Sequence, residues 1–96
     1  LMPAGVYVVQ VKIGERSFYG MANIGYRPTI RMAKHELTAE VNIFNFNHDI
    51  YGKHITMCFL EKIRAEQKFE DLEKLKIQLK KDRDQAKHLL DRYLGN

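Results

Sequence analysis

Glu40 is the residue of this sequence best suited to acid–base chemistry. It lies in an apolar run between Ala39 and Val41, where a carboxylate needs polar partners or a solvent-facing side. A carboxylate held on a rigid element can act as a general base and take a proton from a reacting hydroxyl. The pattern gives equal weight to a second interpretation, in which Glu40 belongs to the wet face of an antiparallel sheet.

Arg64 is the second residue whose type and position suggest a functional role. It closes an apolar segment shortly before Phe69, and a guanidinium beside an aromatic ring suits stacking or anion recognition. A surface ion pair with Glu61 or Glu66 explains the same spacing equally well. The sequence therefore leaves both roles open for Arg64.

Several common reaction motifs are missing from the sequence. The four histidines are dispersed, and no two of them have the spacing of an HExxH zinc site. Neither the GxGxxG turn of dinucleotide-binding folds nor the GxxxxGK[ST] loop of P-loop proteins occurs. The single cysteine, Cys58, excludes an internal disulfide, which suits a reducing compartment.

Composition predicts one small globular domain with an anionic ligand. The chain has 96 residues, of which 45% are apolar and 29% are charged, as is typical of soluble proteins. Its net charge of +4 is spread thinly along the chain, which favours a small phosphorylated ligand over a nucleic acid. No run approaches the ~18 apolar residues that cross a bilayer, so we expect a cytoplasmic protein without membrane contact.

Alternation of apolar and polar residues predicts an antiparallel sheet in the first two thirds of the chain. Gly14–Glu15 supplies a turn between the first two strands, and Gly20 indicates a bulge or a close backbone approach. Residues 25–36 contain Pro28 and have no clear period, so they are predicted to form a long loop. The four predicted strands are 5–13, 16–24, 37–46 and 53–63.

The C-terminal part of the sequence changes to helical periodicity. A helix is predicted over about 71–94, with Asp71 as its N-cap and its basic residues on a solvated face. Asp82 followed by Gln85 resembles a second capping box, so one helix and two helices broken near Lys80 both fit the pattern. A sheet with one C-terminal helix predicts a mainly β barrel or an α+β domain.

Five blocks of the sequence resemble the riboflavin kinase domain of bacterial FAD synthetases. They are LMPAGVY at 1–7, YGMANIGYRPT at 19–29, EVNIFNF at 40–46, DIYGK at 49–53 and IRAEQKF at 63–69. The blocks follow the order of the family from residue 1 to about residue 90. The resemblance implies an antiparallel Greek-key barrel with a C-terminal helix. It also implies ATP-dependent phosphorylation of the ribityl 5′-hydroxyl of riboflavin to give FMN.

The resemblance further implies roles for individual residues. Glu40 matches the family's catalytic base, which accepts the proton of the attacking hydroxyl. The positions that match flavin-contacting residues are Arg64, Gln67 and Phe69. The positions that match nucleotide-contacting residues are Ile43, Asn45 and Tyr51.

The magnesium ligands are expected outside this chain. In the family, Thr and Asn of a Pro-Thr-Ala-Asn run bind the Mg²⁺ that bridges the nucleotide phosphates, and that run precedes the block matched by residues 1–7. Pro28-Thr29 does not replace it, because Ile30-Arg31 follow. The opening Leu1-Met2-Pro3 has no initiator methionine. We therefore expect an N-terminally truncated barrel without its first strands, and little kinase activity from residues 1–96 alone.

The parent protein is expected to be bifunctional. In the family, an N-terminal FMN adenylyltransferase domain converts FMN to FAD, so the implied ligands are riboflavin, ATP, FMN, ADP and Mg²⁺. Unpaired strand edges would favour contact with a second copy, a homo-oligomer. The competing interpretation is a small non-catalytic β-barrel that binds nucleic acid or protein through its aromatic residues, but the diffuse charge argues against nucleic acid.

Overall fold

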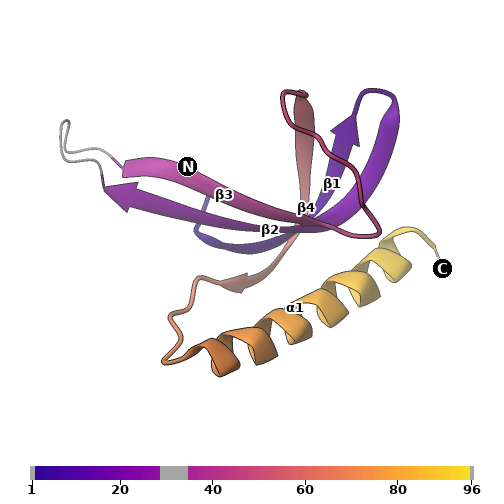
Figure 1. The fold of residues 1–96 in the computed structure, drawn as a ribbon. Coiled ribbons are helices and arrows are strands. Elements are labelled where there is room, and N and C mark those ends of the chain that lie inside the picture. Colours follow the sequence, from indigo (N-terminus) through magenta and orange to yellow (C-terminus); the bar gives the residue numbers. More distant parts are fainter. Residues whose placement is uncertain (1, 29–34, 96) are drawn as a thin grey trace.

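The computed structural model describes residues 2–28 and 35–95. In this part, the chain forms one four-stranded antiparallel sheet and one long helix (Figure 1). The strands are β1 (Gly5–Ile13), β2 (Arg16–Pro28), β3 (His35–Ile43) and β4 (Ile55–Ala65), and helix α1 spans Leu72–Tyr93. The prediction of a mainly β fold with a C-terminal helix is confirmed.

The sheet has the order β3-β2-β1-β4 and is open. β1 pairs along its whole length with β2 and β4, and β2 pairs with β3. Within the described ranges, no ladder joins β3 to β4, so these two strands form the edges of the sheet. Figure 1 shows the long strands bending over α1, which is the shape of a partial barrel.

Two glycines allow the chain to make its tight connections. Gly14, at φ 60°, occupies the first central position of the two-residue turn between β1 and β2, where a type II′ turn requires positive φ. A Cβ on Gly20 of β2 would run into the backbone carbonyl of Asn42 on β3. The close backbone approach predicted at Gly20 is therefore present.

The predicted loop over 25–36 is wrong at both ends, because residues 25–28 continue β2 and residues 35–36 begin β3. Tyr26 pairs with Leu37 and Arg27 with Glu36 across the β2–β3 ladder. The Tyr26 side chain packs against buried apolar residues, and its hydroxyl donates a hydrogen bond to the Met2 carbonyl. Tertiary pairing thus extends a strand whose local pattern is weak. The remainder of the predicted loop, residues 29–34, lies outside the described residues.

The other boundaries differ from the predictions by a few residues. β3 begins at His35 and ends at Ile43 instead of residue 46, because Asn45 takes up the left-handed conformation, with φ 54°. β4 begins and ends two residues later than predicted. Asp71 caps α1 as predicted, and its carboxylate accepts a hydrogen bond from the backbone N–H of Lys74 at 2.9 Å.

Helix α1 is continuous, so the interpretation of Asp82 as a second N-cap is wrong. Asp82 is instead the buried charged residue on the face of α1 that packs against the sheet. No helix within residues 2–28 and 35–95 combines the length and the apolar character needed to cross a membrane.

The two faces of the sheet have different surroundings. On one face, which we call the inner face, Tyr7, Val9, Val11, Ala22 and Ile24 form a buried apolar cluster without residues of α1. On the opposite face, the helix face, a second cluster joins the sheet to residues of α1. Its buried members are Val8, Ala86 and Leu90. The period of two along each strand places neighbouring residues on different faces.

Candidate functional site

The strand registers bring two of the predicted site residues into one row on the helix face. Glu40 of β3 lies opposite Asn23 of β2, Asn23 lies opposite Val6 of β1, and Val6 lies opposite Arg64 of β4. Residues directly opposite each other in antiparallel strands point to the same face. Glu40 and Arg64 are therefore three strand spacings apart on one surface, roughly 14 Å along the sheet.

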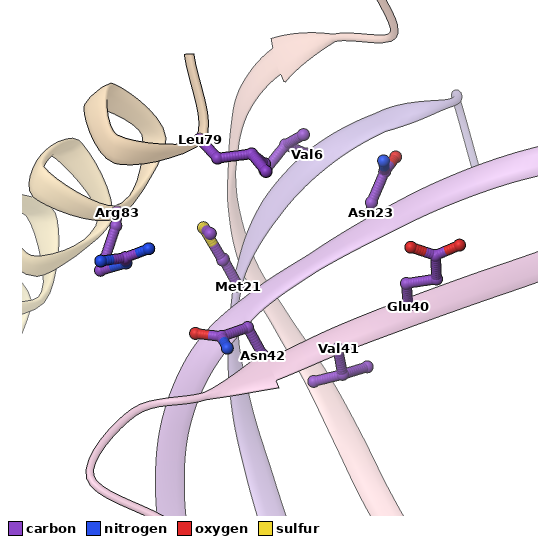
Figure 2. Close-up of a pocket in the computed structure, with 8 residues that line it drawn as sticks. All are labelled: Val6, Met21, Asn23, Glu40, Val41, Asn42, Leu79 and Arg83. Atoms are coloured by element: carbon purple, nitrogen blue, oxygen red, sulfur yellow. The ribbon is translucent and has the colours of Figure 1, made fainter. Parts of the chain in front are cut away.

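Glu40 lines a hollow of about 270 Å³ between the sheet and α1 (Figure 2). Asn23 and Asn42 flank it on the sheet, and Arg83 lines the same hollow from the helix. The Glu40 side chain is exposed and forms no ion pair within the described part of the chain. The carboxylate thus lies on a solvent-facing side of the sheet, which is one of the two interpretations that the sequence left open. It is also accessible to a reacting hydroxyl.

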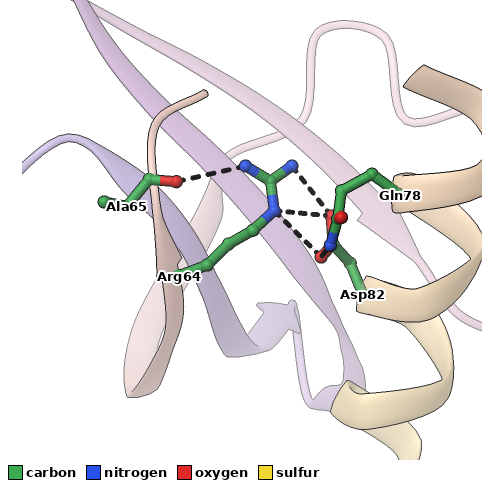
Figure 3. A network of polar contacts seen from close by, with 4 residues as sticks. All are labelled: Arg64, Ala65, Gln78 and Asp82. Carbon is green, nitrogen blue, oxygen red and sulfur yellow. Dashed lines mark hydrogen bonds and ion pairs between the residues drawn. The ribbon is translucent and has the colours of Figure 1, made fainter. Parts of the chain in front are cut away.

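Arg64 is held by a carboxylate from α1 (Figure 3). Its Nε donates to both carboxylate oxygens of Asp82, at 2.9 and 3.0 Å, and its Nη2 donates to Oδ2 at 2.9 Å. The side chain of Asp82 is 1% exposed and that of Arg64 is 17% exposed. The partner is therefore neither Glu61 nor Glu66, and the ion pair is buried between β4 and the helix.

This pairing limits what Arg64 can offer to a ligand. The Nη1 atom donates to the Ala65 carbonyl at 3.1 Å, so three of the five N–H groups of the guanidinium have internal acceptors. The guanidinium carbon lies 5.7 Å from the centre of the Phe69 ring. A ligand contact by Arg64 would have to use the two remaining N–H groups. Its predicted flavin-binding role remains a prediction.

The three residues predicted to bind flavin lie near one another. Gln67 and Phe69 line a second, open hollow of about 240 Å³ at the start of α1, and Arg64 adjoins it through the Phe69 ring. From the helix, Ile77 and Gln78 line the same hollow. An aromatic ring, amide groups and an aliphatic side chain provide surroundings in which a flat heteroaromatic ring with polar edges can bind.

The three residues predicted to bind nucleotide are not gathered around Glu40. Ile43 packs against the inner-face cluster. Asn45 lines a third hollow, of about 480 Å³, together with Phe44 and Lys87, whose Nζ lies 5.4 Å from the Phe44 ring centre. Tyr51 is 97% exposed. Their nucleotide-binding role stays a prediction.

Several residues at these hollows were not identified from the sequence. Asn42 could have been found, because it lies two residues after Glu40 and therefore on the same face of β3. Asn23 requires the strand register, and Asp82 and Gln78 require the position of α1 on the sheet. Arg83 carried no signal that distinguished it from the other basic residues of the helix.

The location of the magnesium ligands outside this chain stays a prediction. Among residues 2–28 and 35–95, no group of three or more His, Cys, Asp or Glu side chains could hold a metal ion. Mg²⁺ prefers an octahedron of oxygen ligands, whereas Glu40 is the single carboxylate in a hollow that it shares with the cationic Arg83.

The sequence matches the flavokinase (riboflavin kinase) family over residues 1–90. It is 38% identical over 85 residues to the bifunctional riboflavin kinase/FMN adenylyltransferase of Bacillus subtilis (strain 168), covering 88% of this chain and 27% of that protein. It is 43% identical over 79 residues to the protein of the same description from Escherichia coli (strain K12), covering 81% of this chain and 25% of that protein.

A solved structure is also similar to this fold. The crystal structure of a Streptococcus pneumoniae protein described as a macrolide-efflux protein matches with a TM-score of 0.77 and 42% sequence identity. The match covers 85% of this chain and 27% of that one. This chain spans about a quarter of the length of the curated relatives it matches.

Proposed function

Because this chain belongs to the riboflavin kinase family, we propose that it acts in the transfer of the γ-phosphoryl group of ATP to the 5′-hydroxyl of riboflavin. The products are FMN and ADP. The observation that carries the proposal is the row on the helix face, with Glu40 at one end and Arg64, beside the Phe69 hollow, at the other. The two ends of the row match the two parts of riboflavin, a flat ring and a polyol chain that ends in the reacting hydroxyl.

Glu40 has the chemistry that the transfer needs. The ribityl oxygen forms a bond to the γ-phosphorus while the bond from that phosphorus to the bridging oxygen of ADP breaks, and the attacking hydroxyl loses its proton. Glu40 accepts this proton as general base. Its carboxylate is accessible and lies on a strand whose other face is packed against the inner-face cluster, so the backbone that carries Glu40 is fixed before the substrate binds.

In this proposal, the second catalytic domain and the magnesium ligands lie outside the described residues. The relatives are bifunctional, and we infer an N-terminal FMN adenylyltransferase domain in the protein that contains this chain. Magnesium and its Thr and Asn ligands are assigned to a segment that precedes residue 1. A cytoplasmic location and pairing with a second copy stay predictions.

The experiment uses the protein that the gene encodes, incubated with riboflavin and Mg·ATP. We expect ADP in an amount equal to FMN and FAD together, because the inferred FMN adenylyltransferase domain converts FMN to FAD. None of these products should form from 5′-deoxyriboflavin, which has no attacking hydroxyl. Formation of ADP without FMN or FAD would contradict the proposal. So would the absence of turnover combined with binding of a single-stranded oligonucleotide, which is the outcome expected of the non-catalytic alternative. The same assay on residues 1–96 alone tests the prediction of little activity from this segment.

A further inference from the structure

We propose that Gln78 determines specificity for the flavin ring and that Asp82 is the positioning residue that orients it. The inference rests on the proposed function and adds a ligand contact from α1. Gln78 lines the hollow that contains Gln67 and Phe69. One turn later on the same helix, Asp82 lies buried beneath it.

The orientation of the Gln78 amide follows from its buried partner. An ionised carboxylate can only accept hydrogen bonds, and Asp82 is paired with the Arg64 guanidinium. The group of Gln78 that faces Asp82 Oδ1, at 3.0 Å, must therefore be the Nε2 amide nitrogen. Among the described residues, no group donates a hydrogen bond to the Oε1 atom of Gln78.

Gln78 thus keeps one acceptor and one donor side by side. Its Oε1 accepts, and the second N–H of Nε2 donates. The pyrimidine edge of a flavin carries an N–H, at N3, between two carbonyl groups. One amide can therefore form two parallel hydrogen bonds with this edge, accepting from N3–H and donating to a neighbouring carbonyl. The opposite, dimethylbenzene edge of the ring offers no polar group, so the amide distinguishes the two edges.

Asp82 contributes without touching the ring. Its carboxylate accepts from Arg64 through both Nε and Nη2 and from Gln78 through Nε2, so one buried group holds both the guanidinium beside Phe69 and the amide that lines the hollow. Replacing the carboxylate by an amide introduces a donor, which lets the Gln78 amide turn over and present the wrong pattern to the ring. Asp82 is therefore expected to affect ligand preference as well as stability.

The test compares riboflavin with 3-methylriboflavin, in which the N3 proton is replaced by a methyl group. Dissociation constants from flavin fluorescence quenching and kcat/KM values are measured for the gene-encoded protein and for Gln78→Leu. We expect the unsubstituted protein to prefer riboflavin about tenfold, the value of one lost hydrogen bond. Gln78→Leu should reduce this preference to within about twofold and leave the KM for ATP unchanged.

Gln85→Leu is the matched control, because Gln85 is an exposed glutamine on the same helix and should keep the full preference. Asp82→Asn should weaken the preference in the same direction as Gln78→Leu. An unchanged preference in Gln78→Leu would overturn the inference while leaving the kinase proposal intact. A protein that neither binds riboflavin nor forms FMN would overturn both.

Discussion

The inner face and the helix face of the sheet use alternate residues of the same strands for different purposes. Val9, Ala22 and Ile24 on the inner face are at most 1% exposed and entirely apolar. Their sequence neighbours on the helix face include Asn23, and the row there continues to Glu40. The inner face fixes the position of the strands, and the helix face presents the groups that can do chemistry.

The two faces also differ in how they are stabilised. The inner face depends on contacts among many apolar side chains, whereas the helix face combines a smaller apolar cluster with the buried ion pair between Arg64 and Asp82. A buried ion pair adds little net stability over an apolar pair of the same shape, but the loss of one partner is costly. Three substitutions, taken from the largest to the smallest expected effect, test this contrast.

Asp82→Ala is expected to cause the largest loss of stability. It leaves the Arg64 guanidinium, which is 17% exposed, without its counter-charge, and the free energy of unfolding should fall by about 4 kcal/mol. Urea denaturation measures the loss. Asp84→Ala, at an exposed position on the same helix, is the control and should change little. Equal losses in the two variants would contradict the assignment of the ion pair.

Ile24→Ala and Asn23→Ala compare the two faces of the sheet at adjacent residues. Ile24 is 1% exposed in the inner-face cluster, and removing three of its side-chain carbons should cost about 3 kcal/mol of unfolding free energy. The activity per folded molecule should be preserved. Asn23→Ala, one residue earlier and on the helix face, should show the reverse: reduced kcat with nearly unchanged stability. If both variants lost stability and neither lost activity, the assignment of structural and chemical roles to the two faces would be wrong.

Gly20→Ala is expected to have the smallest of these effects. The added Cβ meets the backbone of Asn42 on β3, and the two strands must separate slightly, at a cost of about 2 kcal/mol. A shift in the urea midpoint reports this cost, and Ser17→Ala on the exposed part of β2 serves as the reference. A Gly20→Ala protein as stable as the reference would show that β2 and β3 are less closely packed than described.

Some of this structure is predictable from the sequence because it depends on local periodicity. The alternation around Glu40 correctly places it on the opposite face from Val41, and Asp71 is recognisable as a helix cap. The continuation of β2 through Tyr26 is not predictable in this way, because it depends on pairing with β3. The sequence pattern leaves open whether the helix breaks near Lys80, and only the structure shows that it continues through Asp82.

The candidate site also divides into features that the sequence reveals and features that depend on tertiary packing. The family resemblance identifies Glu40, Arg64, Gln67 and Phe69 by their positions in short blocks. It does not reveal that Arg64 and Asp82 meet, because 18 residues separate them and the contact exists only once α1 has packed on β4. The row from Glu40 to Arg64 likewise requires the registers of three strand pairs. Contacts that depend on tertiary packing were therefore the ones that the sequence did not provide.

The most direct test of this account is the turnover of riboflavin by Glu40→Gln, measured beside its unfolding free energy. Glu36→Gln is the control, because Glu36 is an exposed glutamate on the same face of the same strand. We predict that Glu40→Gln lowers kcat about 10³-fold, the contribution of a general base, while its stability and the activity of Glu36→Gln stay unchanged. A Glu40→Gln enzyme with the kcat of the unsubstituted protein would contradict the central claim.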